Sequence, residues 1–216
     1  MLGGCQILDP NTDISELNAI VYRGEIEIKA AAWYRKFSMN AIHLWMLKHG
    51  IYVVPTQELV DFIETCLIGT AIEIGAGNGS IARALGILAT DNKMQTWPEV
   101  VKQYQLAGQP LIYYPKDVIK MDAHDAISEY KPDTVIGAFI THRWLPGMDS
   151  GNQWGVIEEA ILLNCRRYIN VGNAYTHAAK PILKHKHRAY SFPWIITRAI
   201  NQELNRIWIW DANSIS

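Results

Sequence analysis

Cysteines are few in this chain, and long apolar runs are missing. The three cysteines, Cys5, Cys66 and Cys165, are odd in number and far apart, so they form neither a metal-binding spacing nor a disulfide framework. This usage fits a reducing compartment, and we expect a cytoplasmic protein. No stretch approaches the ~20 consecutive apolar residues that a membrane span needs, so no membrane partner is expected.

An excess of charge of one sign is also missing. The sequence has 20 Lys and Arg against 21 Asp and Glu, a net charge of −1. No global basic field recruits nucleic acid, although a local patch leaves that partner open. The 216 residues are 49% hydrophobic and 19% charged, which is typical of a globular chain with room for one full core. We therefore expect a single compact domain.

What the sequence does contain is a glycine-rich stretch at 70–85, TAIEIGAGNGSIARAL. It opens with the apolar run 71–74, interrupted only by Glu73, continues with three alternating glycines, and ends in a helical pattern from Ser80. These features predict a buried parallel strand, a tight turn and a helix N-terminus. The glycines permit positive φ and a close approach to a ligand, and backbone N–H groups at the helix start are expected to point at it.

The spacing of these glycines differs from that of a dinucleotide-binding turn. Such a turn reads G-x-G-x-x-G, whereas the third glycine here, Gly79, comes one residue early. Glu73 stands two residues before the first glycine, where a carboxylate would repel a pyrophosphate and suits a cationic ligand. A glycine-rich turn without a ligand is the alternative interpretation.

The pattern E-x-G-x-G-x-G after a strand resembles the first motif of class I S-adenosylmethionine (SAM)-dependent methyltransferases. The resemblance covers roughly residues 55–216, with the glycine motif as its specific part. It implies SAM as the cofactor, with the loop wrapped around its amino-acid end. The residues that this motif places at the cofactor are Glu73, Gly75, Ala76, Gly77, Asn78 and Gly79.

Acids follow the next two predicted strands. The apolar run ILAT precedes Asp91 and Asn92, and an acid at this point of a βαβ unit is placed to bond ribose hydroxyls. The run VIKM precedes Asp122 and Ala123, where the family resemblance implies recognition of the adenine amino group. An ordinary Asp-Asn turn and a helix cap are the respective alternatives.

The apolar run 134–140 predicts a central strand, and its carboxyl end is expected to face the methyl acceptor. We assign Phe139 to the cofactor site. His142 is the catalytic candidate, because its unperturbed pKa of ~6.5 suits a general base, with a plain loop histidine as the alternative. Nucleic-acid amino-methylating enzymes of the resembled family carry an Asn- or Asp-Pro-Pro-aromatic tetrapeptide here. This chain has FITH and no Pro-Cys pair, which disfavours both base-amino and C5-cytosine methylation.

The remaining pattern predicts an α/β fold: a doubly wound, mostly parallel seven-stranded sheet with an antiparallel C-terminal strand, plus N-terminal helices. We divide the chain into an N-terminal helical arm or lid at 1–55 and a methyltransferase-like domain at 56–216. Further helices are expected at 28–48, 57–67, 99–106, 123–130 and 153–166. Further strands are expected at 168–171, 190–197 and 205–210.

The sequence thus favours SAM-dependent methyl transfer, with a small-molecule or protein acceptor preferred over nucleic acid because the net charge is slightly negative. Two alternatives stay open. One is an NAD(P)-dependent oxidoreductase on a related sheet, and the other is a non-catalytic SAM-fold subunit that binds a partner. No Cys/His pattern closes a zinc site, so no metal is expected.

Overall fold

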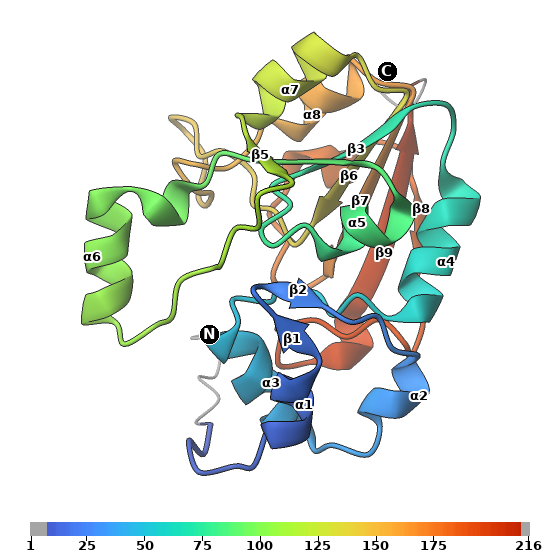
Figure 1. Ribbon diagram of the computed structural model, residues 1–216. Helices are drawn as coiled ribbons and strands as arrows, with labels where there is room; N and C mark the ends of the chain where they lie inside the picture. Colours follow the sequence, from blue (N-terminus) through green and yellow to red (C-terminus); the bar gives the residue numbers. More distant parts are fainter. Residues whose placement is uncertain (1–7, 213–216) are drawn as a thin grey trace.

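The computed structural model describes residues 8–212, and within them a seven-stranded sheet forms the centre of the molecule (Figure 1). Its strand order is β5-β4-β3-β6-β7-β9-β8. The pairings from β5 to β7 are parallel, and β9 is antiparallel to both of its neighbours. This confirms the predicted mostly parallel sheet with an antiparallel last strand. The strands are β3 (Ala71–Ile74), β4 (Leu88–Asp91), β5 (Val118–Lys120), β6 (Thr134–Ala138), β7 (Arg167–Asn173), β8 (Arg188–Tyr190) and β9 (Asn205–Asp211).

Helices cover both faces of the sheet, because successive side chains of a strand point to opposite sides. One apolar cluster joins Ile136, Ile169 and Ile207 to α4 (Gln57–Cys66) and α5 (Ser80–Leu85). The opposite cluster joins Val135, Tyr168 and Trp208 to α7 (Ala123–Tyr130) and α8 (Glu158–Leu162). The sheet is therefore doubly wound, as predicted, and α6 (Pro98–Leu106) stands off to one side (Figure 1). The 3-10 turns are η1 (Met94–Thr96), η2 (Pro181–Lys184) and η3 (Gln202–Leu204).

The N-terminal part forms a separate layer with its own core, packed around Leu17, Tyr34, Trp45 and Met46. Figure 1 shows this layer beneath the lower end of the sheet, next to the chain that precedes β9. Two backbone hydrogen bonds join it to that chain, from Val54 N to the Ile196 carbonyl and from Arg198 N to the Tyr52 carbonyl, both 2.9 Å. Its elements are α1 (Ser15–Ala19), β1 (Val21–Tyr22), β2 (Glu25–Ile26), α2 (Ala31–Tyr34) and α3 (Met39–Lys48).

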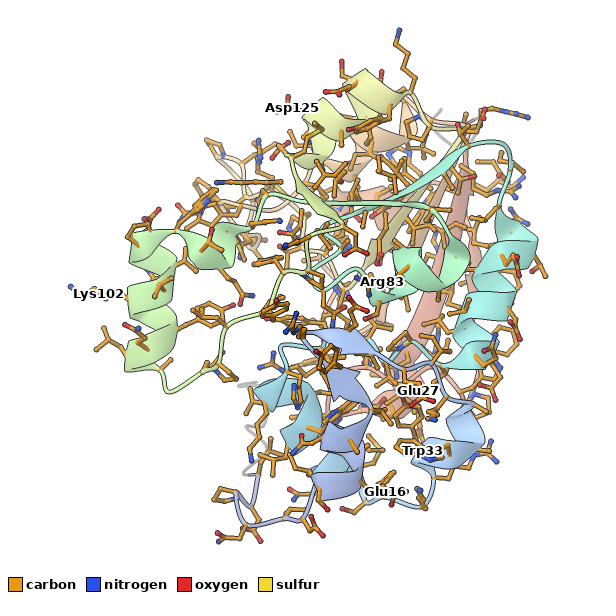
Figure 2. All side chains as sticks on the ribbon, viewed as in Figure 1. Glu16, Glu27, Trp33, Arg83, Lys102 and Asp125 are labelled. Carbon is orange, nitrogen blue, oxygen red and sulfur yellow. The ribbon has the colours of Figure 1, made fainter. Side chains whose placement is uncertain are left out.

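The prediction of a single helix at 28–48 is wrong, because the chain forms two helices there, α2 and α3, with a break between them. Ser38 ends the break: its side chain accepts a hydrogen bond from Ala41 N at 3.2 Å and so caps α3. Trp33 lies in the N-terminal layer, far from Lys102 on α6 (Figure 2), and Lys36 lies over its ring at 4.4 Å. Trp33 packs against the core of this layer.

Two further boundaries differ from the prediction. The helix expected at 153–166 is shortened to α8, because the chain before it pairs with the segment after β6 through a bridge between His142 and Val156. The strand expected at 190–197 ends at Tyr190, and a turn around Pro193 follows, closed by a hydrogen bond from Ile195 N to the carbonyl of residue 192. Both misassigned segments are apolar sequences whose conformation is set by distant parts of the chain. None of the described helices is long and apolar enough to cross a membrane.

Candidate functional site

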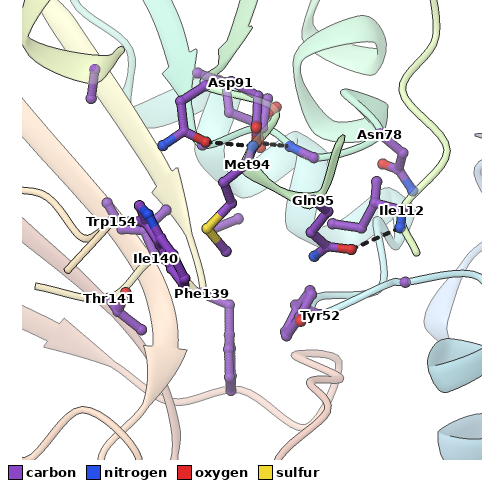
Figure 3. Close-up of a pocket in the computed structure, with 18 of the residues that line it drawn as sticks. Tyr52, Asn78, Asp91, Met94, Gln95, Ile112, Phe139, Ile140, Thr141 and Trp154 are labelled. Atoms are coloured by element: carbon purple, nitrogen blue, oxygen red, sulfur yellow. Dashed lines mark hydrogen bonds between the residues drawn. The ribbon is translucent and has the colours of Figure 1, made fainter. Parts of the chain in front are cut away.

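A cavity of about 250 Å³ opens at the carboxyl ends of β3, β4 and β6 (Figure 3). Open α/β sheets bind ligands at this edge. Figure 3 shows Trp154, Ile140 and Thr141 on one side and Gln95, Ile112 and Tyr52 on the other. The structure brings together ten predicted cofactor residues in the lining: Glu73, Gly75, Ala76, Gly77, Asn78, Asp91, Asn92, Asp122, Ala123 and Phe139. Gly79 and His142 are not among the residues that line it.

Glu73 lies at the floor of the cavity beneath the glycine loop. Its side chain is 2% exposed, and its Oε2 accepts a hydrogen bond from Ala82 N at 2.8 Å. Burial raises the pKa of Glu73 to about 8, and the nearby Asp91 carboxylate acts in the same direction. A cationic group entering the cavity would reverse this shift, because it stabilises the ionised carboxylate.

The glycine loop differs in one respect from the expectation that its N–H groups point at a ligand. Several of these donors are used inside the protein: Ala76 N bonds the Thr90 carbonyl, Gly77 N bonds Asp91, and Ser80 N bonds the Asn78 side chain. The loop therefore offers a ligand a backbone surface that it can approach closely, and fewer free N–H donors than expected. Gly77 has φ +57°, and a Cβ there would point toward the Ile112 side chain at 3.6 Å, across the cavity.

Gly79 has a packing role and does not face the cavity. It is the N-cap of α5 with φ +68°, and a Cβ at this position would lie 2.7 Å from Val118 Cγ2 and 3.5 Å from Ala89 Cβ. The glycine thus lets α5 start directly against β4 and β5. Its prediction as a residue in contact with the cofactor is not supported by its position.

Asp91 ends β4 and ties three segments together. Its Oδ2 accepts from Gly77 N at 2.9 Å and its Oδ1 from Lys93 N at 2.6 Å, and the Tyr114 hydroxyl also donates to it. Burial raises the pKa of Asp91, although these hydrogen bonds oppose the effect. A carboxylate has about four lone-pair positions, so Asp91 retains acceptor capacity toward ligand hydroxyl groups.

Asp122 serves as a helix cap, the alternative that the sequence left open. It precedes α7, and its Oδ1 accepts from His124 N at 3.0 Å. Its Oδ2 lies 3.7 Å from the Arg143 guanidinium, a loose and half-exposed ion pair. Because Asp122 also lines the cavity beside Asn92 and Trp154, capping and ligand contact are compatible.

His142 is held away from the cavity. Its Nε2 lies 2.8 Å from the Ser150 carbonyl oxygen, and its backbone pairs with Val156. This contact uses Nε2, so a general base at His142 would have to act through Nδ1, and the residue does not line the cavity. The catalytic role of His142 stays a prediction.

Several lining residues carried no recognisable signal in the sequence. Tyr52 comes from the N-terminal layer, Tyr104 from α6, and Ile112 and Tyr114 from the extended chain that follows α6. Ile112 N donates to the Gln95 side chain at 2.9 Å, which fastens this extended chain across the glycine loop. The only sequence signal there is the pair of breakers Gly108 and Pro110, which predicts an irregular segment without placing it.

The charge of the cavity is of one sign. Among the described residues, those that line it include the carboxylates Glu73, Asp91 and Asp122 and no Lys, Arg or His. Two guanidinium groups lie close to lining residues without lining the cavity themselves: Arg143 is 3.7 Å from Asp122, and Arg198 lies over the Tyr52 ring at 4.8 Å. The site therefore favours a cation over a phosphate-bearing ligand.

No protein-family model and no curated protein matches the chain. Similar solved structures include an rRNA methylase from Streptococcus thermophilus, 14% identical with a TM-score of 0.39, covering 70% of this chain and 93% of that one. A SAM-dependent methyltransferase from Agrobacterium tumefaciens is 13% identical with a TM-score of 0.33, covering 72% and 60%. SMU.776, described as a candidate methyltransferase and solved with S-adenosylhomocysteine (SAH), is 8% identical with a TM-score of 0.39. The match covers 70% of this chain and 48% of that one, so this chain spans about half of its length.

Proposed function

We propose that the protein is a SAM-dependent methyltransferase. The observation that carries this proposal is the cavity at the strand ends, which holds three acidic side chains and no cationic side chain among its described lining residues. A bound cation would favour the ionised form of each of them, Glu73 included. SAM has an ammonium and a sulfonium cation, both of which this field stabilises. The pyrophosphate of NAD(P) would meet the same carboxylates with repulsion, so an oxidoreductase is disfavoured.

The residues present fit this cofactor in chemistry and position. Glu73 and the loop from Gly75 to Asn78 would hold its amino-acid end, and Asp91 would accept from its ribose hydroxyls. Asp122 and the indole of Trp154 would flank the adenine, the first through its carboxylate and the second through its ring face. When bound, SAM supplies an already activated methyl group. The protein's own task is then to align the acceptor and exclude water.

The N-terminal layer would act as the cover of this site. Tyr52 and its neighbours Ile51 and Val53 line the cavity, and hydrogen bonds to residues 196 and 198 fix them there. A cavity closed on this side admits a small molecule or one protein side chain more readily than a folded nucleic acid. We propose an acceptor of the first two kinds.

Calorimetry with four ligands tests the proposal. We expect SAM and SAH to bind, and NAD and NADP to bind at least tenfold more weakly. Because Glu73 is largely protonated in the free protein near pH 7, binding of the ligand ammonium should release a proton. The measured enthalpy at pH 7 should therefore differ between phosphate and Tris, which ionise with different heats.

Two outcomes would contradict this function. Tight NADP binding without SAM binding would support the oxidoreductase alternative. SAM binding in the Glu73→Gln variant with an unchanged dependence on buffer would remove Glu73 from the ammonium site. A suitable control is Glu64→Gln, which alters an exposed carboxylate on α4 outside the cavity.

A further inference from the structure

One wall of the cavity is not used by the proposed cofactor contacts. We call it the aromatic wall, and it consists of Tyr52, Tyr104 and Phe139. The hydroxyl groups of Tyr52 and Tyr104 are hydrogen-bonded to each other, and the rings of Tyr52 and Phe139 lie 6.0 Å apart with a tilt of 33°. Three segments remote in sequence thus bring ring surfaces to one place (Figure 3 shows two of them).

Phe139 is held in this wall at a conformational cost. Its φ is +59°, a region that bulky side chains rarely adopt, and its N–H donates to the Val171 carbonyl at 2.7 Å. The ring also packs edge-on against His177, with centroids 4.8 Å apart. The next residue, Ile140, lies against the glycine loop, because a Cβ on Gly75 would come within 2.8 Å of its side chain. Phe139 therefore precedes, in the chain, a residue that packs against the loop that would hold the methyl donor.

Bases are missing from this side of the cavity. On this side the cavity is lined by residues 50–53, 104, 112, 114, 138–141, 152 and 154–156. None of these described residues is Asp, Glu, His, Lys or Cys. Tyr104 is no substitute, because burial raises its pKa to about 12. An alcohol, or an aliphatic amine that is protonated at neutral pH, would need to lose a proton to such a base before methylation.

From these observations, and resting on the proposed methyl transfer, we propose that the acceptor is a small heteroaromatic molecule that is methylated on a neutral ring nitrogen. The ring nitrogen uses its lone pair to form a bond to the methyl carbon, while the carbon–sulfur bond breaks and its electron pair stays on sulfur. No proton moves, so no base is required. The product is an N-methyl cation, which the Phe139 ring and the carboxylates of the cavity stabilise. The guanidinium of Arg198 already lies over the Tyr52 ring at 4.8 Å, so that ring is not assigned to the product cation.

Isoquinoline and two molecules of similar shape test this acceptor class. With SAM present, we expect isoquinoline to yield N-methylisoquinolinium and SAH, with a rate that falls only at pH values low enough to protonate the ring nitrogen. We expect no methylation of 2-naphthol, which needs a base, or of 2-naphthoate, which is an anion. N-acetylhistidinamide presents the same kind of nitrogen on a peptide, and we expect it to react more slowly than isoquinoline.

A pair of matched variants tests the wall itself. Phe139→Leu removes the ring but keeps an apolar side chain, and should raise the KM for isoquinoline three- to tenfold, a larger factor than its effect on the Kd for SAH. Phe62→Leu makes the same change outside the cavity, against Tyr190 and Phe192, and should leave this KM unchanged.

The outcomes separate this proposal from the proposed function. If SAM does not bind, methyl transfer itself fails. If SAM binds but isoquinoline is not methylated, or if 2-naphthol, 2-naphthoate or N-acetylhistidinamide is preferred, the heteroaromatic acceptor is wrong while the cofactor assignment stands. Equal KM values for wild type and Phe139→Leu would also overturn it.

Discussion

Glu73 makes the stability of this protein depend on pH in a direction that can be worked out from the structure. Its carboxyl group is fully buried, and its pKa rises from 4.5 to about 8 on folding. A carboxyl group whose folded pKa is raised stabilises the fold fully below its unfolded pKa, and this contribution is lost as the pH rises through the folded pKa. At ~1.36 kcal/mol per pKa unit, the loss between pH 4.5 and pH 8 or above is up to about 5 kcal/mol.

Glu73→Gln should remove this dependence, because an amide does not ionise and its oxygen can still accept from Ala82 N. We would measure the free energy of unfolding by urea titration from pH 5 to pH 9 for both proteins. Relative to wild type, the variant should gain several kcal/mol of stability across this range. Burial of the amide NH₂ changes the variant's free energy of unfolding by an amount that does not depend on pH, so it does not affect how the difference from wild type changes with pH. Glu129→Gln, on the exposed face of α7, controls for the loss of a carboxylate.

A difference in unfolding free energy that stays constant from pH 5 to pH 9 would refute this reasoning. It would mean that Glu73 is already ionised near its ordinary pKa, with solvent or a cation reaching the floor of the cavity. The cavity would then already carry this negative charge at neutral pH, and cofactor binding would release no proton from Glu73.

Three further predictions concern the glycine loop and the core. Gly77→Val should lower SAM affinity at least tenfold by calorimetry, since its side chain would lie against Ile112 in the cavity lining and a β-branched residue at φ +57° strains the loop; unchanged affinity would remove the loop from the site. Gly79→Ala should instead destabilise the fold by about 1–3 kcal/mol in urea titration, because its Cβ meets β5 at positive φ. Lys180→Met should cost about 3–5 kcal/mol, because it leaves buried Glu158 without its ion-pair partner 2.8 Å away. Lys186→Met, on an exposed position, should cost little, and equal losses in the two variants would contradict this role of burial.

The sheet was predictable because its signal is local. Three of the parallel strands coincide with short apolar runs followed by a glycine or an acid, as in 71–74 before Gly75 and 87–90 before Asp91, and the run 134–138 is apolar as well. Such runs show their burial directly. The glycine motif is also a local signal, and it predicted where the cavity opens. Asp91 and Asp122 also reach the cavity, although Asp122 caps a helix at the same time.

The rest of the site depends on contacts between distant residues. Ile112 and Tyr114 reach the cavity because Gln95 and Asp91 hold them, and neither partner is visible as a pattern in the sequence. In the misassigned helix at 28–48, two local sequence signals disagreed. There the apolar period continued through Ser38, but the capping hydrogen bond of that residue started a new helix.

The attachment of Tyr52 to the chain before β9 has a consequence for biosynthesis. The Tyr52 carbonyl accepts a hydrogen bond from Arg198 N, and Val54 N donates to the Ile196 carbonyl, so one wall of the cavity is anchored by residues that are made long after it. On the ribosome, the glycine loop and the first parallel strands emerge before these anchors. Binding competence should therefore arise only after residue 198 has been made, and a nascent chain stalled before residue 196 would expose an open half-site.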